Sequence, residues 1–277
     1  MQSSTASSLR KIVVTGANKG IGYSIVDGLL GGETPYNVIL TARAPKKAET
    51  ALHSLQEKHK NSKGKVQSQL LNITDPVSIQ HFADWVQHEL GTIDVLINNA
   101  GIGFWPENKA QKLETINTNF LSTIALTEKI LPHLSKDGKI IMLSSGLGRL
   151  KRQGPEVRKI LEDPNLTLEK LLELSGKLYE HCEHETPNDL EFSSSSYDAT
   201  KCLLNAYTRW VLPKMLKGDQ QCFCMDPGWC RTDMGGSNAD KSPEEGADTA
   251  IYLTNLPFVK DPNLNGKFFG KRQVVEF

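Results

Sequence analysis

Short apolar runs alternate with longer amphipathic stretches along most of the chain. The runs lie at residues 12–14, 38–40, 66–71, 95–97 and 140–143. Runs of this length between helix-length segments are typical of strands buried on both faces. Alternation of strands and helices predicts an α/β fold with a doubly wound, mainly parallel sheet of the Rossmann type, flanked by helices on both faces.

Helix signals fill the gaps between these runs. Residues 22–30 are amphipathic, residues 45–60 are charged with helical spacing, and a stretch beginning at Tyr197 continues to about Leu216. Asp75-Pro76 has the form of an N-cap followed by a first-turn proline, which predicts a helix start there. Together with the strands, these helices predict a single dinucleotide-binding and catalytic domain over residues 1–277.

One region, residues 149–194, breaks the alternation because it is highly charged and holds no strand-like run. Its leucines recur at roughly helical spacing, which predicts a helical insertion of one or two amphipathic helices over the edge of the domain. His181, Cys182 and His184 lie within it, but zinc would need a fourth ligand and a tighter pattern, so we expect a solvated helix end and no metal site. The leucines are Leu161, Leu168, Leu171, Leu172, Leu174 and Leu178.

Composition narrows the class of protein. Lys+Arg and Asp+Glu both total 32, which argues against a chain-wide electrostatic interaction with nucleic acid or an acidic membrane. No apolar run approaches the roughly 18 residues that span a bilayer. The first eight residues lack the apolar segment of a signal peptide. Five cysteines without metal-like or disulfide-like spacing suit a reducing compartment, so we expect a cytoplasmic protein.

A glycine-rich stretch, TGANKGIG (residues 15–22), joins the first predicted strand to the first helix. Glycines allow a tight turn and let backbone N–H groups approach a pyrophosphate at the positive N-terminus of the helix. The spacing Gly-x-x-x-Gly-x-Gly differs from the GxGxxG fingerprint. Its position at the first strand–helix junction nevertheless predicts a dinucleotide site.

The end of the second predicted strand indicates which dinucleotide binds. An NAD site usually carries an acidic residue there, which binds the ribose 2′-hydroxyl. Here the strand ends in Thr41-Ala42-Arg43, and the next carboxylate is Glu49. Arg43 can make charge-assisted contacts to a 2′-phosphate, and Lys19 adds a second cation. Both could simply be exposed basic residues, but the missing acid and the two cations together favour NADP(H).

Tyr197 and Lys201, within YDATK (residues 197–201), are four apart and so share one face of a predicted helix. A tyrosine with its ordinary pKa of about 10 is a poor acid–base at neutral pH. A nearby ammonium stabilises the phenolate and lowers that pKa, as a proton donor to a carbonyl oxygen requires. The pattern is common by chance, so its weight depends on its partners.

Two polar residues are candidate partners. Ser145 follows the apolar run 140–143 at the carboxyl end of a strand, the edge at which open α/β sheets bind ligands. Its hydroxyl could hydrogen-bond a substrate oxygen as charge develops, although Ser144-Ser145-Gly146 alone could be a turn. Asn119 lies in a predicted helix, where a buried amide needs partners and could hold a water beside the lysine. Residues 98–101 (NNAG) end the fourth strand and could also be merely a turn.

These residues together resemble the short-chain dehydrogenase/reductases, and within them the monomeric, NADPH-dependent carbonyl reductases. The resemblance implies reduction of small-molecule carbonyl compounds, and an apolar, aromatic pocket favours bulky ketones, aldehydes and quinones. It also implies a monomer, because in that subfamily a helical insert covers the surface that other members use to form tetramers. The matching segments follow the family's order: TGANKGIG (15–22), LTAR (40–43), DVLINNAGI (94–102), TNF (118–120), SS (144–145), YDATK (197–201), DPGWCRTDM (226–234) and KSPEEGA (241–247).

The resemblance also implies roles by position. Tyr197 would be the proton donor, Lys201 would bind the nicotinamide ribose, Ser145 would orient the carbonyl, and Asn119 would anchor a water in a proton relay. The implied NADPH-binding residues are Gly16, Asn18, Lys19, Gly20, Ile21, Gly22, Arg43, Asn72, Ile73, Asn99, Ala100, Gly101, Tyr197, Lys201, Pro227, Gly228, Cys230 and Thr232. The implied substrate pocket comprises Trp105, Gln111, Ser145, Leu147, Tyr197, Trp229 and Met234.

Two positions depart from the family pattern. At the end of the third strand, Asn72 stands where the family usually places Asp against the adenine amino group. Its amide still offers an acceptor oxygen, so we expect a modest loss of adenine contact. Asp226 precedes Pro227 where some carbonyl reductases carry a cysteine, which argues against glutathione-adduct substrates and places a carboxylate near the pocket.

Two other functions remain open at this point. One is an alcohol dehydrogenase that oxidises a steroid, terpenoid or prostanoid alcohol, which the sequence separates from a reductase only through Arg43. The other is a regulatory protein that binds the cofactor without catalysis. Such proteins typically lose a catalytic residue, whereas Asn119, Ser145, Tyr197 and Lys201 are all present.

Overall fold

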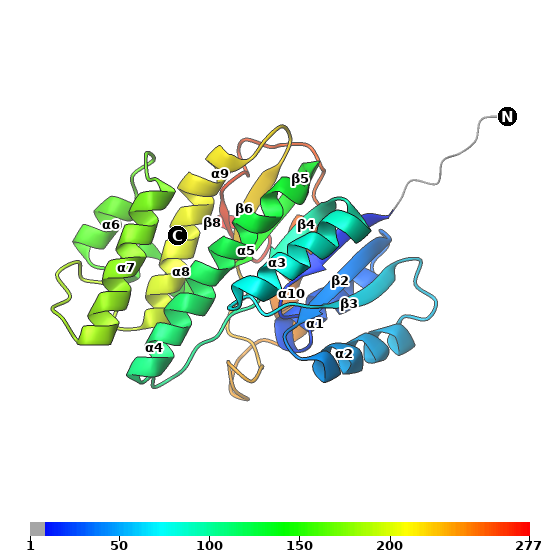
Figure 1. The fold of residues 1–277 in the computed structure, drawn as a ribbon, viewed down its shortest axis with the longest axis horizontal. Helices are drawn as coiled ribbons and strands as arrows, with labels where there is room; N and C mark the ends of the chain where they lie inside the picture. Colours follow the sequence, from blue (N-terminus) through cyan, green and yellow to red (C-terminus); the bar gives the residue numbers. More distant parts are fainter. Residues whose placement is uncertain (1–8) are drawn as a thin grey trace.

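The computed structural model describes residues 9–277, so the prediction about a signal peptide, which concerns residues 1–8, lies outside the described residues. An eight-stranded sheet with the order β3-β2-β1-β4-β5-β6-β7-β8 forms the centre of the molecule (Figure 1). All neighbouring strands are parallel except β7 and β8, which are antiparallel. The predicted doubly wound α/β fold is confirmed.

The strands agree with the predicted apolar runs to within a few residues and add three that follow the fifth run. Their bounds are β1 (Arg10–Val14), β2 (Tyr36–Ala42), β3 (Lys65–Leu70), β4 (Ile93–Asn98), β5 (Leu134–Leu143), β6 (Gln221–Asp226), β7 (Phe268–Gly270) and β8 (Gln273–Val275).

The helices are α1 (Gly20–Gly31), α2 (Pro45–Lys58), α3 (Pro76–Trp85), α4 (Lys109–Ile116), α5 (Thr123–Ile130), α6 (Pro155–Leu161), α7 (Leu168–His184), α8 (Ser196–Ala206), α9 (Leu212–Met215) and α10 (Pro243–Asn255). The predicted start of α3 is confirmed, because the Asp75 carboxylate accepts a hydrogen bond from the Val77 N–H and Pro76 begins the helix. No helix within residues 9–277 is long and apolar enough to cross a membrane.

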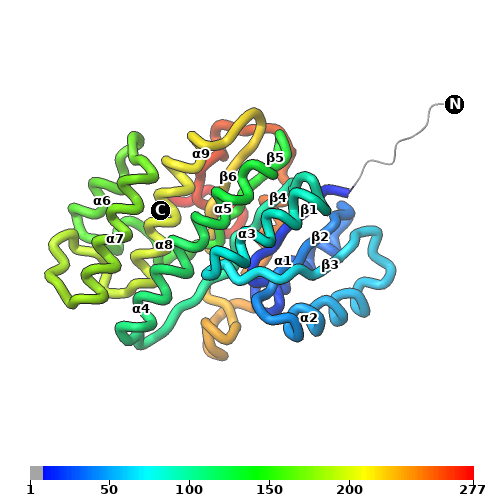
Figure 2. The backbone as a smooth tube through the Cα atoms, viewed as in Figure 1, coloured from blue at the N-terminus to red at the C-terminus, as the bar shows by residue number. Residues whose placement is uncertain are grey.

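Two apolar layers enclose the sheet, one on each face. Along β1, Val13 packs into one layer, whereas Ile12 and Val14 pack into the other, because successive side chains of a strand point to opposite faces. The first layer includes residues of α3, α5 and α8, and the second includes residues of α1, α2 and α10. Figure 2 shows α3 and α5 side by side in front of the strands.

Residues 149–194, where the sequence predicts a helical insertion, contain α6 and α7. Leu171, Leu174 and Leu178 are buried, whereas Leu172 on the opposite side of α7 is 41% exposed. Helix α7 packs against α4 and α8 at one end of the molecule (Figure 1). Helix α7 therefore covers the outer sides of α4 and α8.

Candidate active site

The carboxyl ends of β1, β4, β5 and β6 are neighbours in the sheet, and each continues into a segment that carries candidate residues. The glycine-rich loop follows β1, residues 99–108 follow β4, and Ser145 follows β5. Asp226 ends β6 and begins the loop of residues 227–242. Ligands of open α/β sheets bind at this edge, so the topology alone brings these segments to one site.

The glycine-rich loop has the close backbone approach that a dinucleotide cradle needs. Gly16 has φ +60°, which favours glycine, and a Cβ on Gly22 would lie 2.8 Å from the Gly16 carbonyl oxygen. The Thr15 hydroxyl accepts hydrogen bonds from the N–H groups of Asn99 and Ala100, both at 2.9 Å. The Asn99 amide in turn donates to the Thr15 carbonyl at 2.8 Å. These bonds fix the loop to the end of β4, and the N-terminus of α1 leaves backbone N–H groups free for phosphates.

The loop after β6 reaches the glycine-rich loop. A Cβ on Gly20, which has φ +57°, would lie 3.2 Å from the Thr232 methyl group. Lys19 forms an ion pair with Asp233, and both side chains are largely exposed. Lys19 was predicted as a cation for the 2′-phosphate, and the structure pairs it with a carboxylate of the facing loop. Exposed ion pairs contribute little stability, so a phosphate could replace Asp233 at small cost.

Three residues predicted near the adenosine have different surroundings. Arg43 is exposed directly after β2. Ile73 is buried within the apolar layer on the α3 side of the sheet. The side-chain oxygen of Asn72, Oδ1, accepts from the Thr74 hydroxyl at 3.0 Å and from the Thr74 N–H at 3.3 Å. Asn72 Oδ1 therefore holds its own turn, and the adenine contact expected from the sequence stays a prediction.

Tyr197 lies in the first turn of α8, and its surroundings are built by two other segments. The Ser195 hydroxyl caps the helix by accepting from the Asp198 N–H at 3.3 Å. The Glu107 carboxylate accepts from the Ser196 N–H at 2.7 Å and from the Ser196 hydroxyl at 2.5 Å. A negative charge is favourable at a helix N-terminus. Glu107 thus holds the residue next to Tyr197, and sequence reasoning missed it because the contact spans 89 residues.

Lys201 lies one turn further along α8, buried below the tyrosine. Its Nζ is 5.6 Å from the Tyr197 ring centroid and donates to the Leu143 carbonyl at 2.8 Å. Burial lowers the pKa of Lys201 to about 8 and raises the pKa of Tyr197 to about 12, with hydrogen bonding to Ser145 opposing the second shift. Burial therefore opposes the lowering of the tyrosine pKa that the ammonium was expected to produce, because burial disfavours both charged forms.

Asn119 lies in a π-helical segment (Asn117–Ser122) between α4 and α5. Its side chain makes two reciprocal bonds with Ile102, accepting from the N–H and donating to the carbonyl, both at 2.8 Å. A Cβ on Gly101 would lie 3.2 Å from Asn119 Oδ1 and 3.6 Å from Lys201 Nζ. The amide and the ammonium therefore flank the same glycine, as the predicted partnership requires.

Ser145 lies between β5 and α8, and the surrounding loop is packed tightly on the helix. A Cβ on Gly148 would lie 2.6 Å from the Lys201 backbone, and the Gly148 carbonyl accepts from the Asn205 amide at 3.0 Å. The Ser145 hydroxyl accepts from the Leu147 N–H at 3.1 Å. Since this bond uses only an acceptor lone pair, the hydroxyl proton remains available for another partner.

Large apolar side chains are exposed around this edge. Trp105, Trp229 and Met234 are 54%, 57% and 38% exposed. The Trp105 ring packs edge-on against Tyr197 with a centroid distance of 5.2 Å. Leu147 is half-buried next to Ser145. Exposed aromatic rings beside buried polar groups are typical of a site for an apolar ligand.

Gln111, the remaining predicted pocket residue, lies in the first turn of α4. Its side chain accepts from the Asn108 N–H at 2.9 Å, and the Asn108 side chain accepts from the Gln111 N–H at 3.0 Å. This capping box begins α4 and gives Gln111 a structural partner that the prediction of a pocket residue did not anticipate.

A turn in the loop after β6 carries the remaining predicted cofactor residues. Gly228 has φ +78°, and Lys241 Nζ donates to the Pro227 carbonyl at 3.1 Å. Cys230 is buried, and burial raises the pKa of its thiol to about 11. A thiol with so high a pKa is not a nucleophile at neutral pH, so the position has a packing role.

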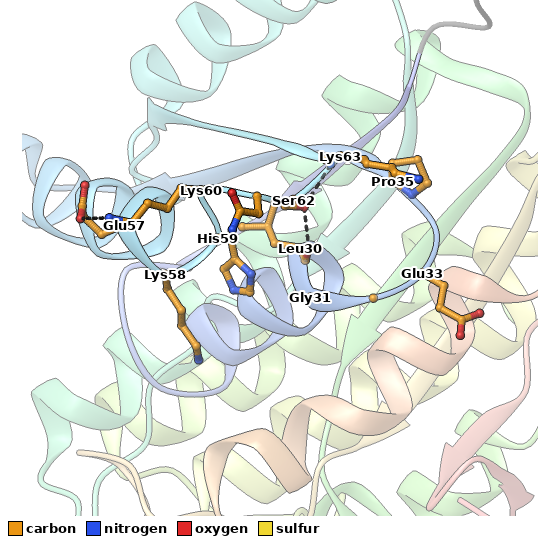
Figure 3. Close-up of a pocket in the computed structure, with 13 residues that line it drawn as sticks. Leu30, Gly31, Glu33, Pro35, Glu57, Lys58, His59, Lys60, Ser62 and Lys63 are labelled. Carbon is orange, nitrogen blue, oxygen red and sulfur yellow. Dashed lines mark hydrogen bonds and ion pairs between the residues drawn. The ribbon is translucent and has the colours of Figure 1, made fainter.

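A separate surface pocket lies away from this edge, between the C-terminal ends of α1 and α2 (Figure 3). Lys58, His59, Lys60 and Lys63 line it together with acidic and apolar residues. It adjoins the amino ends of β2 and β3 and contains none of the candidate residues. Elsewhere, no group of three or more His, Cys, Asp or Glu side chains within residues 9–277 could hold a metal ion.

Known proteins of similar sequence and structure indicate the family of this chain. The family model of short chain dehydrogenases matches residues 10–156. Carbonyl reductase (NADPH) 1 of Sus scrofa is 34% identical over 284 residues, which cover 98% of this chain and 96% of the relative. Among solved structures, salutaridine reductase from Papaver somniferum has a TM-score of 0.83 and 26% identity, covering 94% of this chain and 99% of that one.

A second solved structure, NADPH-bound carbonyl reductase from chicken fatty liver, has a TM-score of 0.68 and 26% identity, covering 97% of this chain and 99% of that one. The family model covers more than half of the chain, and the Sus scrofa relative matches along nearly its full length. The resemblance stated from the sequence motifs is confirmed. The chain belongs to the short-chain dehydrogenase/reductase family.

Proposed function

We propose that this protein is an NADPH-dependent reductase of carbonyl compounds, in particular bulky ketones, aldehydes and quinones. The observation that carries the proposal is the convergence of Tyr197, Lys201, Ser145 and Asn119 beside the glycine-rich loop. Lys201 lies 5.6 Å from the tyrosine ring centroid, and Lys201 and Asn119 flank Gly101. The similarity to carbonyl reductase (NADPH) 1 supports this assignment.

The glycine-rich loop and the N-terminus of α1 would hold the pyrophosphate of NADPH. Arg43 and Lys19 would bind its 2′-phosphate, and the turn at residues 227–232 would lie against its nicotinamide. When bound, NADPH supplies the hydride that reduces the carbonyl carbon. The close approach at Gly16 and Gly22, which a side chain would block, fits a bound dinucleotide.

The remaining steps belong to the chain's own residues. Tyr197 donates its phenolic proton to the carbonyl oxygen, while the Ser145 hydroxyl hydrogen-bonds the same oxygen as negative charge develops on it. The raised pKa of Tyr197 keeps the phenol protonated at neutral pH, the form that reduction needs. Lys201 has one N–H on the Leu143 carbonyl and so retains two donors for ribose hydroxyls. Asn119 fixes Ile102 and with it the loop after β4.

Oxidation of a steroid, terpenoid or prostanoid alcohol remains the second candidate, because the same residues serve the reverse reaction. Proton abstraction from an alcohol would require a phenolate, which burial disfavours at Tyr197. Arg43, which fits the 2′-phosphate of NADPH, favours reduction. Nothing in the geometry favours a regulatory protein without activity.

Two further features belong to the proposal. We propose a monomer, because α7 covers the outer sides of α4 and α8. We also propose a cytoplasmic location, since all five cysteines are buried and free rather than paired in disulfides.

The direct test of the proposed chemistry is Tyr197→Phe. Loss of the proton donor should lower kcat with an aromatic ketone on the order of 10²–10⁴-fold, the usual contribution of general acid catalysis. The dissociation constant for NADPH, measured by fluorescence titration, should stay within about twofold, because the glycine-rich loop is untouched.

The matched control is Tyr207→Phe, which removes a buried hydroxyl from the continuation of α8, where its contact is the Met215 sulfur at 4.0 Å. Turnover should persist in this variant. Full activity of Tyr197→Phe would contradict the assigned role.

A further inference from the structure

Asp226 places an unpaired carboxylate at the reacting edge of the sheet. It is the last residue of β6 and is half-buried. Its Oδ1 accepts from the Gly228 N–H at 2.9 Å. A Cβ on Gly146 would lie 2.7 Å from Oδ2, so the carboxylate lies directly over this glycine. Gly146 stands between Ser145 and Leu147, the proposed carbonyl-orienting and pocket residues.

The two neighbouring lysine side chains donate hydrogen bonds to backbone carbonyls and not to Asp226. Lys241 Nζ donates to the Pro227 carbonyl at 3.1 Å, and Lys201 Nζ donates to the Leu143 carbonyl at 2.8 Å. Neither forms an ion pair with Asp226, and no other cation does so within residues 9–277. Within residues 9–277, the Gly228 N–H binds Oδ1 of Asp226, and no hydrogen-bond donor binds Oδ2.

A turn cap alone does not account for a carboxylate here. Asn or Ser would accept the Gly228 N–H equally well, without a charge to bury. A half-buried carboxylate that forms no ion pair within residues 9–277 can attract a cationic ligand. The position of Oδ2 over Gly146 would bring such a cation next to Ser145.

We propose that Asp226 is a specificity-determining residue that selects carbonyl substrates bearing a positively charged nitrogen, such as an ammonium group. The inference rests on the proposed reductase function and deepens it by naming a substrate class. Asp226 acts on the charged nitrogen of the substrate and makes no contact with the carbonyl itself, so it should affect the choice among ketones more than the chemical step.

The test compares two ketones of equal shape, (4-acetylbenzyl)trimethylammonium and 4-neopentylacetophenone, which differ in one charge. Asp226→Asn keeps an acceptor for the Gly228 N–H and removes the charge. We expect the ratio of kcat/KM for the cationic over the neutral ketone to fall about tenfold in this variant, as for a partly desolvated charge pair. Any effect of Asp226→Asn on Tyr197 changes kcat/KM for both ketones equally and therefore cancels in the ratio.

The control is Asp219→Asn, which removes the same charge from an exposed position at the other end of β6. The ratio should stay within about twofold there, because an exposed charge beyond a Debye length is screened. An unchanged ratio in Asp226→Asn, or an equal fall in both variants, would overturn the inference while leaving the reductase function standing. Failure of the wild-type protein to reduce either ketone with NADPH would overturn the proposed function, and this inference with it.

A second measurement uses only the wild-type protein and so does not depend on the folding of a variant. Added potassium chloride should raise KM for the cationic ketone and leave KM for the neutral ketone nearly constant, because salt screens the charge pair. Parallel responses of the two ketones would contradict a role for the Asp226 charge.

Discussion

Tyr197 and Lys201 show what spacing can and cannot predict. Their separation of four residues on a helix correctly predicted a shared face, with Lys201 Nζ 5.6 Å from the Tyr197 ring centroid. The pKa of the tyrosine was predicted to fall, but burial raises it to about 12. Burial depends on segments far away in the sequence, among them Trp105, which packs on the tyrosine ring.

Three polar residues illustrate the same limit. The side chains of Asn72 and Gln111 hold a local turn and a capping box, which the sequence did not predict, and their contacts with ligands stay predictions. Short-range bonds of this kind compete with any ligand contact for the same atoms. Glu107 was not predicted at all, because nothing near it in the sequence signals a bond to Ser196.

Arg43 should decide between NADPH and NADH. Arg43→Asp places a carboxylate at the exposed end of β2, where it can bind a ribose 2′-hydroxyl but repels a 2′-phosphate. We expect KM for NADPH to rise at least about tenfold and KM for NADH to fall, measured with one ketone at saturation. The control Lys46→Asp removes a nearby exposed cation from α2 and should leave the preference for NADPH intact. Equal cofactor preference in wild type and Arg43→Asp would contradict the assignment.

The apolar runs located five strands, of which β1, β2, β4 and the second half of β5 are largely buried, whereas the edge strand β3 is only partly buried. The last two strands, β7 and β8, have three residues each and are too short for a periodic signal. Alternation of strands and helices predicted a mainly parallel sheet. The order of its strands came from the structure. The contact between Glu107 and the start of α8 joins residues that are 89 apart in the sequence, so it is visible only in the folded structure.

The C-terminal end of helix α10 contacts a buried lysine of β5. Lys139 of β5 donates to the carbonyls of Leu253 at 3.2 Å, Thr254 at 2.8 Å and Leu256. Its Nζ also lies 3.8 Å from the Phe258 ring centroid. Burial, with a smaller contribution from the charge of Arg10, lowers the pKa of Lys139 to about 7.

This shift predicts a pH dependence of stability. Between about pH 7 and pH 10 the unfolded chain holds a proton on Lys139 that the folded protein releases, so the free energy of unfolding rises with pH across this window. Lys139→Met should remove that rise, measured by guanidinium unfolding at about pH 6.5 and about pH 9.5. The control Lys136→Met, an exposed lysine on the same strand, should follow the wild type. Parallel curves for wild type and Lys139→Met would contradict the shift.

At the scale of the whole molecule, the position of α6 and α7 bears on assembly. Helix α7 packs on α4 and α8, and its buried leucines leave mainly charged residues outside. A surface of this kind is unsuited to a large apolar interface. We therefore expect light scattering in solution to give the mass of one chain, 30.7 kDa. A stable tetramer would contradict the proposal.

Reduction of a carbonyl group by NADPH can be followed through the transferred hydride itself. The wild-type protein is incubated with 4-neopentylacetophenone and NADPH that carries deuterium at both positions of nicotinamide C4. Mass spectrometry of the product should show the secondary alcohol with one deuterium on the former carbonyl carbon, formed in equal amount to the NADPH consumed. An alcohol without deuterium at that carbon, or NADPH that binds tightly while no alcohol forms from ketones, aldehydes or quinones, would contradict the account.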